Sequence, residues 1–552
     1  MKRRDALLTL AATGPCLGTG TRVGASPIAF DYESPYEKVD WSCWEIVHSM
    51  SHQHQGMTDS SRELFRAMGY GHFAFSNYYP SAPTSLPDAF REANPGVSWS
   101  PNAEQHSFLD SGLHFNSLGS RLATGYGSSL SSNERSKAPI RHRFEKLNRF
   151  DELRPWEGVY RLDIRLEHPD GTGKGSVATL SLGGARACQR QEGFADEGPV
   201  EGRALDPGNH TIYLRNQSDA IELSLEYDPM QIEVTQLRLM QGTNRPWREV
   251  FRATLDGESR EGVTEGGLLY PDGGGITLNH PTGKAEDYCE MLDFDPRVLG
   301  IEVWNQLTSG FGSDRGFYSS MEDPPAHFYG LWDEILATGR RCWGFFVKDH
   351  NTYGRGRNVL FVPPLEGASV EEREAALLRS YRRGAFYGSV SAIAANDAGE
   401  VVPPYDRSEL RFSRFRLRRN AIGQAESLEV AVTGNDVELR PNLQIRFVTE
   451  KGVAAVADQP EAEFPLTPVS PDEEPPLFVR VEVVSYPDTH LGGKPLTTSM
   501  VQNMGVAEIA TLHDRHAKRG RTFFGNSAEM RTPIPIADLI FSQPILRVSA
   551  EA

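Results

Sequence analysis

Apolar runs and helix-like segments alternate over residues 41–120 and again from Trp247 onward. Trp44 to Val47 form a strand-like apolar run, and the helical pattern SSRELFRAMGYG and a second apolar run, HFAFS, come after it. The later stretch contains the apolar runs GGITLNHP, LGIEVWN and CWGFFV, with a helix expected around FYGLWDEILATG. This β-α-β alternation predicts a parallel sheet or barrel.

Two other stretches alternate polar and apolar residues with a period of two, as half-buried strands do. Between Trp156 and Met240, runs such as VYRLDIRLEH and IELSLEYD are separated by turn residues such as HPDGTGKG. The alternation resumes after VVPP at 401–404 and continues to PILRV. We therefore predict an antiparallel β-sandwich inserted within an α/β domain, and a second β-sandwich at the C-terminus.

Length and composition bound the class of protein. The chain has 552 residues, too many for one compact core, so about two to four domains are expected. The predicted divisions are 1–30 (export signal), 31–125 and 246–400 (two parts of the α/β domain), 126–245 (inserted sandwich) and 401–552 (terminal sandwich). The 57 basic and 74 acidic residues give a net charge of -17, which disfavours nucleic acid as a partner.

Membrane and disulfide signals are weak along the chain. No apolar run approaches the roughly 20 residues of a membrane span, so no integral span is expected. The five cysteines are widely spaced without a CxxC pair, which indicates neither a zinc knuckle nor a disulfide framework. The oligomeric state is not predicted.

The N-terminus has the features of an export signal. Lys2, Arg3 and Arg4 precede a short apolar stretch and then small residues, and adjacent arginines are typical of a twin-arginine signal. We therefore expect export to the periplasm or the extracellular space. The alternative is an ordinary basic terminus.

Histidines and carboxylates stand at the ends of several apolar runs. His52 and His54 come after the first run, and alternation along an extended chain puts both imidazoles on one face, where they can bind one ion. The further candidates are Glu104, His114, His280 and the pair Asp349–His350. Groups at the carboxyl ends of barrel strands converge although they are distant in sequence. Each residue alone also fits a structural role, so the prediction depends on their joint order.

This order resembles the polymerase and histidinol phosphatase (PHP) superfamily: HxH, then Glu, then His, then a strand ending in HP, then a strand ending in Asp and His. The likeness covers residues 41–120 and 247–365. FSQPILRV near the C-terminus is similar to the closing segment of a secreted branch that resembles carbamate hydrolases. The resemblance implies an α/β fold class, with a distorted (β/α)7 barrel that holds zinc, manganese or iron ions.

The resemblance also implies which residues bind metal. One divalent ion would be held by His52, His54, Glu104 and Asp349, and a second by Glu104, His114 and His280. Glu104 would bridge the two ions, and a hydroxide shared between them would be the nucleophile. Glu104, Asp349 and His350 are the expected catalytic residues. Lys284 and Arg355 are the expected substrate-binding residues because they are cations that flank the late motifs and suit phosphate or carboxylate recognition; the alternative is solvated surface charge.

Two departures from the family pattern concern a third ion. Asn77 and Tyr78 stand where an aspartate and a histidine are expected, and Asp59 would be one of few remaining ligands. The last motif usually reads Asp-x-His, whereas Asp349 and His350 are adjacent here. We therefore expect two metal ions rather than three.

Three functions remain open from the sequence. The leading one is a phosphoesterase acting on a small-molecule or glycan-linked ester. The second is hydrolysis of a carboxyl or carbamate ester, or of an amide, at the same site. The third is a non-catalytic carbohydrate-binding protein, in which aromatic residues of the inserted module such as Trp156 and Tyr160 stack on sugar.

Overall fold

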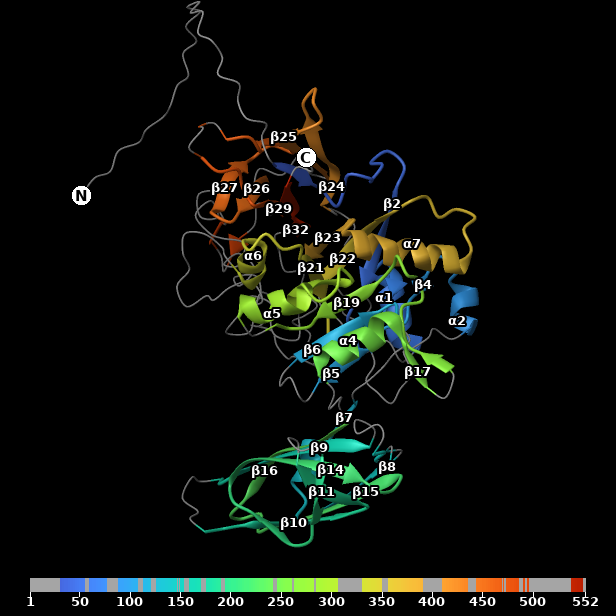
Figure 1. Cartoon of the computed structure of the whole chain (residues 1–552), viewed down its shortest axis with the longest axis vertical. Coiled ribbons are helices and arrows are strands. Elements are labelled where there is room, and N and C mark those ends of the chain that lie inside the picture. Colours follow the sequence, from blue (N-terminus) through green and yellow to red (C-terminus); the bar gives the residue numbers. More distant parts are fainter. Residues whose placement is uncertain are drawn as a thin grey trace, which may run out of the picture.

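The computed structural model is built mainly from β-strands, with thirty-three strands and seven helices in the residues that it describes. Figure 1 shows a large body that contains most of the chain and a smaller module at the opposite end from the C-terminal strands. The described residues are 30–54, 59–76, 88–107, 113–120, 126–145, 147, 149–152, 158–169, 175–189, 194–241, 246–260, 263–281, 284–305, 330–349, 356–390, 410–434, 443–468, 470, 473–485, 490–491, 494–495 and 538–549.

Two sheets of the large body meet at the candidate site. The first has the strand order β21 (Trp343–Val347), β20 (Val298–Asn305), β19 (Gly275–Leu278), β6 (Leu113–Leu118) and β5 (Glu104–Ser107). The second runs β1 (Phe30–Glu33), β33 (Ile545–Ser549), β29 (Phe478–Ser485), β32 (Asp538–Ser542), β23 (Phe386–Val390), β22 (Gly356–Val362), β2 (Glu45–Met50), β3 (Tyr70–Phe73) and β4 (Ser98–Trp99). Strands β26 (Leu443–Thr449) and β27 (Gly452–Ala457) join the second sheet at β29.

The predicted α/β class with a (β/α)7 barrel is wrong. Strands β2, β3 and β4 are parallel, as are β19, β20 and β21, but these triplets lie in separate sheets. Within the described residues no hydrogen-bonded ladder closes them into a barrel. Strand β6 runs antiparallel to β5 and β19, and β22 runs antiparallel to β2 and β23. Parallel neighbours need a long crossover, and the short connection 108–112 favours an antiparallel β5–β6 pair.

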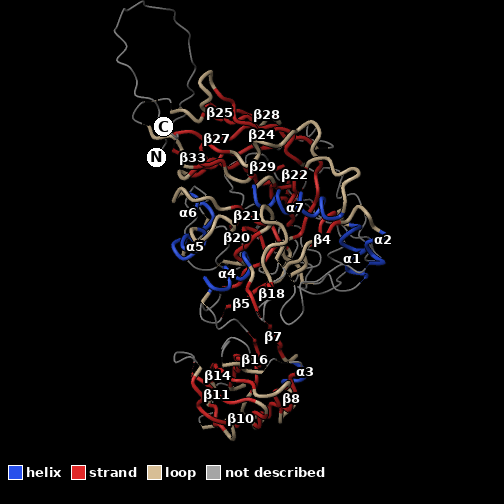
Figure 2. Tube along the Cα trace, turned by 45° about the vertical axis from the view of Figure 1, so that its right-hand side comes forward, coloured by secondary structure: helices blue, strands red, loops and turns tan. Residues whose placement is uncertain are grey.

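The helices lie around these two sheets (Figures 1 and 2). They are α1 (Asp59–Ala67), α2 (Asp88–Ala93), α4 (Trp247–Asp256), α5 (Ala285–Leu292), α6 (Leu331–Leu336) and α7 (Val370–Arg383). Helix α7 begins with a capping box between Ser369 and Glu372 and ends at Gly384, whose φ of 71° suits glycine. Its Leu378 and Tyr381 share a core with residues of β21 to β23. Among the described residues, no helix has both the length and the apolar character to cross a membrane.

The inserted module has its own core and lies at one end of the molecule (Figure 2). One of its sheets is β13 (Arg203–Leu205), β10 (Ala178–Gly183), β15 (Ala220–Glu226) and β8 (Ile140–Glu145). The other is β12 (Ala195–Pro199), β11 (Ala185–Gln189), β14 (Gly208–Asn216), β9 (Val159–Glu167), β16 (Glu233–Gln241) and β7 (Tyr126–Ser129). The short helix α3 (Ser132–Arg135) belongs to this module. Every paired neighbour in both sheets is antiparallel.

The C-terminal strands continue the sheet that carries β2. Strand β23 pairs with β32, and β32 pairs with β29. A separate three-stranded sheet in this region consists of β24 (Arg411–Arg419), β25 (Ala425–Thr433) and β28 (Glu461–Pro465). Two further two-stranded sheets are β17 (Glu258–Arg260) with β18 (Val263–Glu265), and β30 (His490–Leu491) with β31 (Lys494–Pro495). Arg480 of β29 is fully buried and donates to Asp333 of α6 and to Glu482. This ion cluster ties α6 to the C-terminal strands.

Candidate metal centre

The HxH segment follows β2 and lies beside the end of β21. The Asp349 amide donates to the His52 carbonyl at 3.1 Å, and the His54 amide donates to the Asp349 carbonyl at 3.3 Å. Gln53 forms an isolated parallel bridge with Asp349. These backbone bonds bring together His52, His54 and Asp349, here named the HxH group, although almost 300 residues separate them in the chain.

Three further side chains meet where β5, β6 and β19 lie next to one another. Glu104 pairs with Asn116 across the antiparallel β5–β6 ladder. His114 lies two residues before Asn116, so its side chain is on the same face as Glu104. His280 follows β19, where the Asn279 amide donates to the His114 carbonyl at 2.9 Å. We name Glu104, His114 and His280 the Glu104 group.

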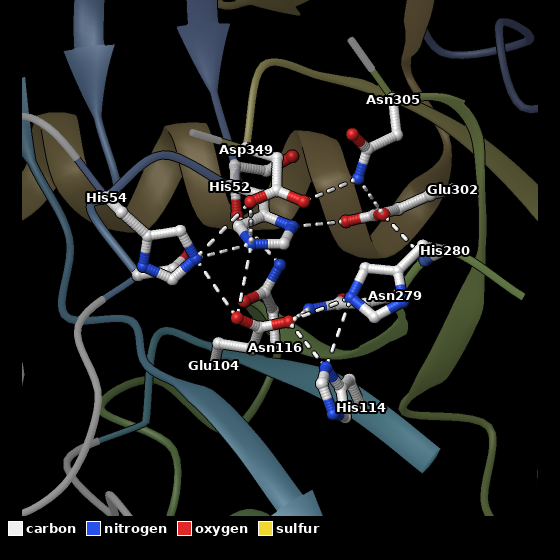
Figure 3. Close-up of polar contacts among 12 residues, drawn as sticks. His52, His54, Glu104, His114, Asn116, Asn279, His280, Glu302, Asn305 and Asp349 are labelled. Atoms are coloured by element: carbon white, nitrogen blue, oxygen red, sulfur yellow. Dashed lines mark hydrogen bonds and ion pairs between the residues drawn. The ribbon is translucent and has the colours of Figure 1, made fainter. Parts of the chain in front are cut away.

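The two groups meet at the Glu104 carboxylate, which has one oxygen facing the histidines of the HxH group and the other facing His114 and His280 (Figure 3). Its Oε2 lies 3.0 Å from His54 Nε2 and 3.6 Å from His52 Nε2. Its Oε1 lies 3.2 Å from His114 Nδ1 and 3.1 Å from His280 Nε2. The carboxylate therefore has the arrangement that a ligand bridging two cations requires.

The donor atoms fit a small divalent cation. Bond lengths of about 2.0–2.2 Å in a tetrahedron imply ligand atoms roughly 3.3–3.6 Å apart. In the HxH group, Asp349 Oδ1 lies 3.7 Å from His52 Nε2 and 3.6 Å from His54 Nε2, and the two Nε2 atoms are 3.0 Å apart. In the Glu104 group, His114 Nδ1 and His280 Nε2 are 3.2 Å apart. Imidazole nitrogen and carboxylate oxygen suit zinc, manganese and iron.

Backbone strain is found at this site. The described non-glycine residues with positive φ are Phe194, His280 and Asp349, with φ of 62°, 26° and 52°. Such conformations cost of order 1–3 kcal/mol and persist only where the surrounding structure enforces them. Two of the three, His280 and Asp349, belong to the candidate centre, so the surrounding structure holds these side chains in place at a cost in stability.

The site has a strongly negative potential. Burial lowers the pKa of His52, but the Glu302, Asp349 and Glu104 carboxylates outweigh burial and raise it well above its usual range. Burial lowers the pKa of His280 too, but its hydrogen bond to Glu104 and the charges of Glu104, Glu302 and Asp349 together outweigh burial and raise it. Burial raises the pKa of Glu104, but nearby His52 and its other histidine partners outweigh this and depress it. These carboxylates stabilise positive charge at His52 and His280, whereas burial lowers the pKa of His114. A bound cation would be stabilised by the same carboxylates.

Two residues of the centre were missed at the sequence level. Glu302 and Asn305 lie on β20 and are both fully buried. Glu302 Oε1 lies 2.6 Å from His52 Nδ1, and Asn305 Nδ2 donates to Asp349 Oδ2 at 3.0 Å. The signal was present in LGIEVWN, where an acid and an amide interrupt an apolar run.

The remaining predicted residues contribute less to the described site. Lys284 is exposed at the start of α5, where its amide donates to Asp287 Oδ2 at 3.2 Å. His350 and Arg355 lie outside the described residues. So do Asn77, Tyr78, the Asp59 side chain and the predicted signal before residue 30, together with Trp156 of the inserted module.

Tyr160, proposed for sugar stacking, is fully buried in the core of the inserted module. Its ring therefore offers no surface to a sugar.

Comparison with family models and with curated proteins identifies no relative of this chain. The chain matches no family model, and it has no significant match among curated proteins.

Proposed function

We propose that this chain is a metal-dependent hydrolase that binds two divalent cations, zinc, manganese or iron, on either side of Glu104. The observation that carries the proposal is the division of the Glu104 carboxylate between two sets of histidines, at 3.0 Å from His54 and 3.1 Å from His280. The order of these residues along the chain, which resembles the PHP superfamily, supports the same proposal.

Bound cations would supply a water molecule of lowered pKa and would polarise the bond under attack. The protein's own residues would hold and orient this centre. The side chains of His52, Glu104 and Asp349 are 0%, 2% and 3% exposed, whereas those of His114 and His280 are 26% and 23% exposed. Because catalytic sites keep an open position, substrate would enter on the side of the Glu104 group.

A phosphoester is the substrate class that we propose first. Two-cation sites that share a carboxylate are typical of phosphoryl transfer. A carboxyl or carbamate ester, or an amide, is the alternative, since the cations polarise C=O and P=O bonds alike. We also propose that the protein is exported, because of the arginine pair at its N-terminus.

Metal titration combined with an ester screen tests the proposal. Purified protein stripped with chelator would be titrated with Zn²⁺ and Mn²⁺, then assayed on phosphomonoesters, phosphodiesters and carboxyl esters. We expect two ions per chain and metal-dependent turnover of a phosphoester. Turnover of carboxyl esters alone would select the alternative substrate, and a protein that binds no metal and turns over no ester would refute the proposal.

A control variant tests whether metal binding depends on the histidines of the candidate centre or on histidines elsewhere in the chain. His142→Ala/His210→Ala changes two partly exposed histidines of the inserted module. We expect its metal content and activity to equal those of the wild type.

A further inference from the structure

We propose that Glu302 is a positioning residue that couples the two halves of the metal centre. This inference rests on the proposed function, because it assumes that the HxH group and the Glu104 group bind cations. Glu302 touches neither the reacting atoms nor the bridging carboxylate. Its role is to fix one ligand from each group.

The Glu302 carboxylate lies between residues of both groups (Figure 3). Its Oε1 is 2.6 Å from His52 Nδ1, in the HxH group. Its Oε2 accepts from the His280 backbone amide at 2.7 Å, in the Glu104 group, and from Asn305 Nδ2 at 3.0 Å. Glu302 is fully buried, so water does not compete for these bonds. One side chain therefore connects two segments that are over 200 residues apart.

The contact with His52 selects its tautomer. An ionised carboxylate accepts hydrogen bonds and cannot donate them, so His52 Nδ1 carries the proton. In the neutral imidazole that binds a cation, His52 Nε2 would then be the nitrogen with the lone pair, and this atom faces Glu104 and Asp349 at 3.6 and 3.7 Å. Metal-binding histidines are commonly fixed in this way by a carboxylate on the far ring nitrogen.

The contact with His280 stabilises a strained backbone. His280 has φ of 26°, a conformation that a side-chain-bearing residue adopts only when it is held. Its amide donates to Glu302, and its Nε2 reaches Glu104 Oε1 at 3.1 Å. Without the carboxylate, the backbone could relax and move the imidazole away from the Glu104 group.

Asn305 extends the same network to a third candidate ligand. Its Nδ2 donates both to Glu302 Oε2 and to Asp349 Oδ2, each at 3.0 Å. These bonds leave Asp349 Oδ1 directed at the two histidines of the HxH group. Glu302 and Asn305 thus position His52, His280 and Asp349 together.

Glu302→Gln tests the inference with the smallest change of shape. Three donors converge on the carboxylate, from His52, His280 and Asn305. An amide has one acceptor oxygen, and its NH₂ group must face at least one of those donors. We expect affinity for both ions to fall by about 10–100-fold, the usual cost of losing such a partner. Affinity would be measured without substrate, by competition between a chromophoric chelator and the protein for Zn²⁺.

Two further measurements distinguish positioning from general destabilisation. The absorption spectrum of Co²⁺-loaded protein reports ligand geometry and should change in Glu302→Gln. Glu374→Gln is the matched control, because Glu374 is a buried carboxylate on α7 that accepts from the Tyr270 hydroxyl at 3.3 Å. Its metal affinity and Co²⁺ spectrum should equal those of the wild type, whatever its melting temperature.

Asn305→Ala keeps the inference testable if Glu302→Gln does not fold. This variant should lower the affinity for the ion at the HxH group more than the affinity for the ion at the Glu104 group, because Asn305 donates directly to Asp349. Wild-type affinity at both positions in Glu302→Gln, or an unchanged Co²⁺ spectrum, would overturn the role of Glu302 while leaving the proposed function intact. A wild-type protein that binds no ion would instead refute the proposed function.

Discussion

Replacing His72 by glutamine should remove a loss of stability that the wild-type protein suffers in mild acid. His72 lies on β3 next to the strand that leads into the HxH segment, and it is fully buried. Its Nδ1 lies 2.7 Å from Ser49 Oγ, and its Nε2 lies 2.9 Å from Ser100 Oγ. Tyr381 donates to Ser49, so the Ser49 hydroxyl can donate to Nδ1, and Nε2–H then donates to Ser100. A neutral imidazole satisfies this network fully.

The magnitude is set by the pKa of His72. Burial lowers this pKa from 6.5 to about 3. The unfolded chain therefore takes up a proton on His72 as the pH falls below 6.5, whereas the folded protein does not until about pH 3. Stability is at its full value above this window and is lost as the pH falls through it. At pH 5 the loss is about 2 kcal/mol, from 1.36 kcal/mol per pH unit.

Urea unfolding of metal-free protein measures this effect. The free energy of unfolding would be determined at about pH 7.5 and about pH 5 for the wild type and for His72→Gln. Glutamine can still donate to one serine and accept from the other, but it does not titrate. The wild type should lose about 2 kcal/mol more than the variant between the two pH values. Equal losses in the two proteins would refute the reasoning.

Three further perturbations address the site and the packing around it. His52→Ala/His54→Ala should abolish activity and lower the metal content, because two ligands are lost; it should also lower the free energy of unfolding, because buried Glu302 loses its partner His52, and unchanged metal stoichiometry would contradict the assignment. Glu104→Gln should lower kcat far more than Lys284→Ala, which should act mainly on KM; steady-state kinetics would show equal effects on kcat if the roles are misassigned. Arg480→Met should cost about 3–5 kcal/mol in urea unfolding, because it leaves two buried carboxylates without their cation; a cost below about 1 kcal/mol would show that this cluster does not hold α6 in place.

The sequence could predict where chemistry gathers because polar residues follow apolar runs. His52, His280 and Asp349 each lie two positions past the end of a strand, and strand ends meet at one edge of a fold. The structure brings these residues together with Glu104 and His114. Metal binding by them stays a prediction. Periodicity also indicated the strands of the inserted module, because one face of each strand is buried.

The barrel could not be judged from periodicity, because an apolar run specifies a strand but not the direction of its neighbour. The sequence of β6 fits a strand of a parallel barrel, yet β6 pairs antiparallel with both of its neighbours. Strand β22 likewise connects β2 to the C-terminal strands instead of closing a ring. These pairings depend on contacts between distant segments.

Glu302 was missed for a different reason. It stands inside a strand whose eight residues are all buried, so the pattern LGIEVWN was interpreted only as a core strand. A buried acid without a visible partner in the local sequence is itself a signal, because burying a charge is costly unless it is paired. The partner, His52, lies 250 positions away.

Anomalous scattering from crystals of metal-loaded protein, recorded at the absorption edge of the bound metal, tests the central claim most directly. We predict two full-occupancy peaks, one among His52, His54 and Asp349 and one between His114 and His280, with an oxygen of Glu104 next to each. No peak at these positions, or a peak that Glu104 does not touch, would contradict the proposed centre. A third full-occupancy peak beside His350 would show that the centre is not binuclear.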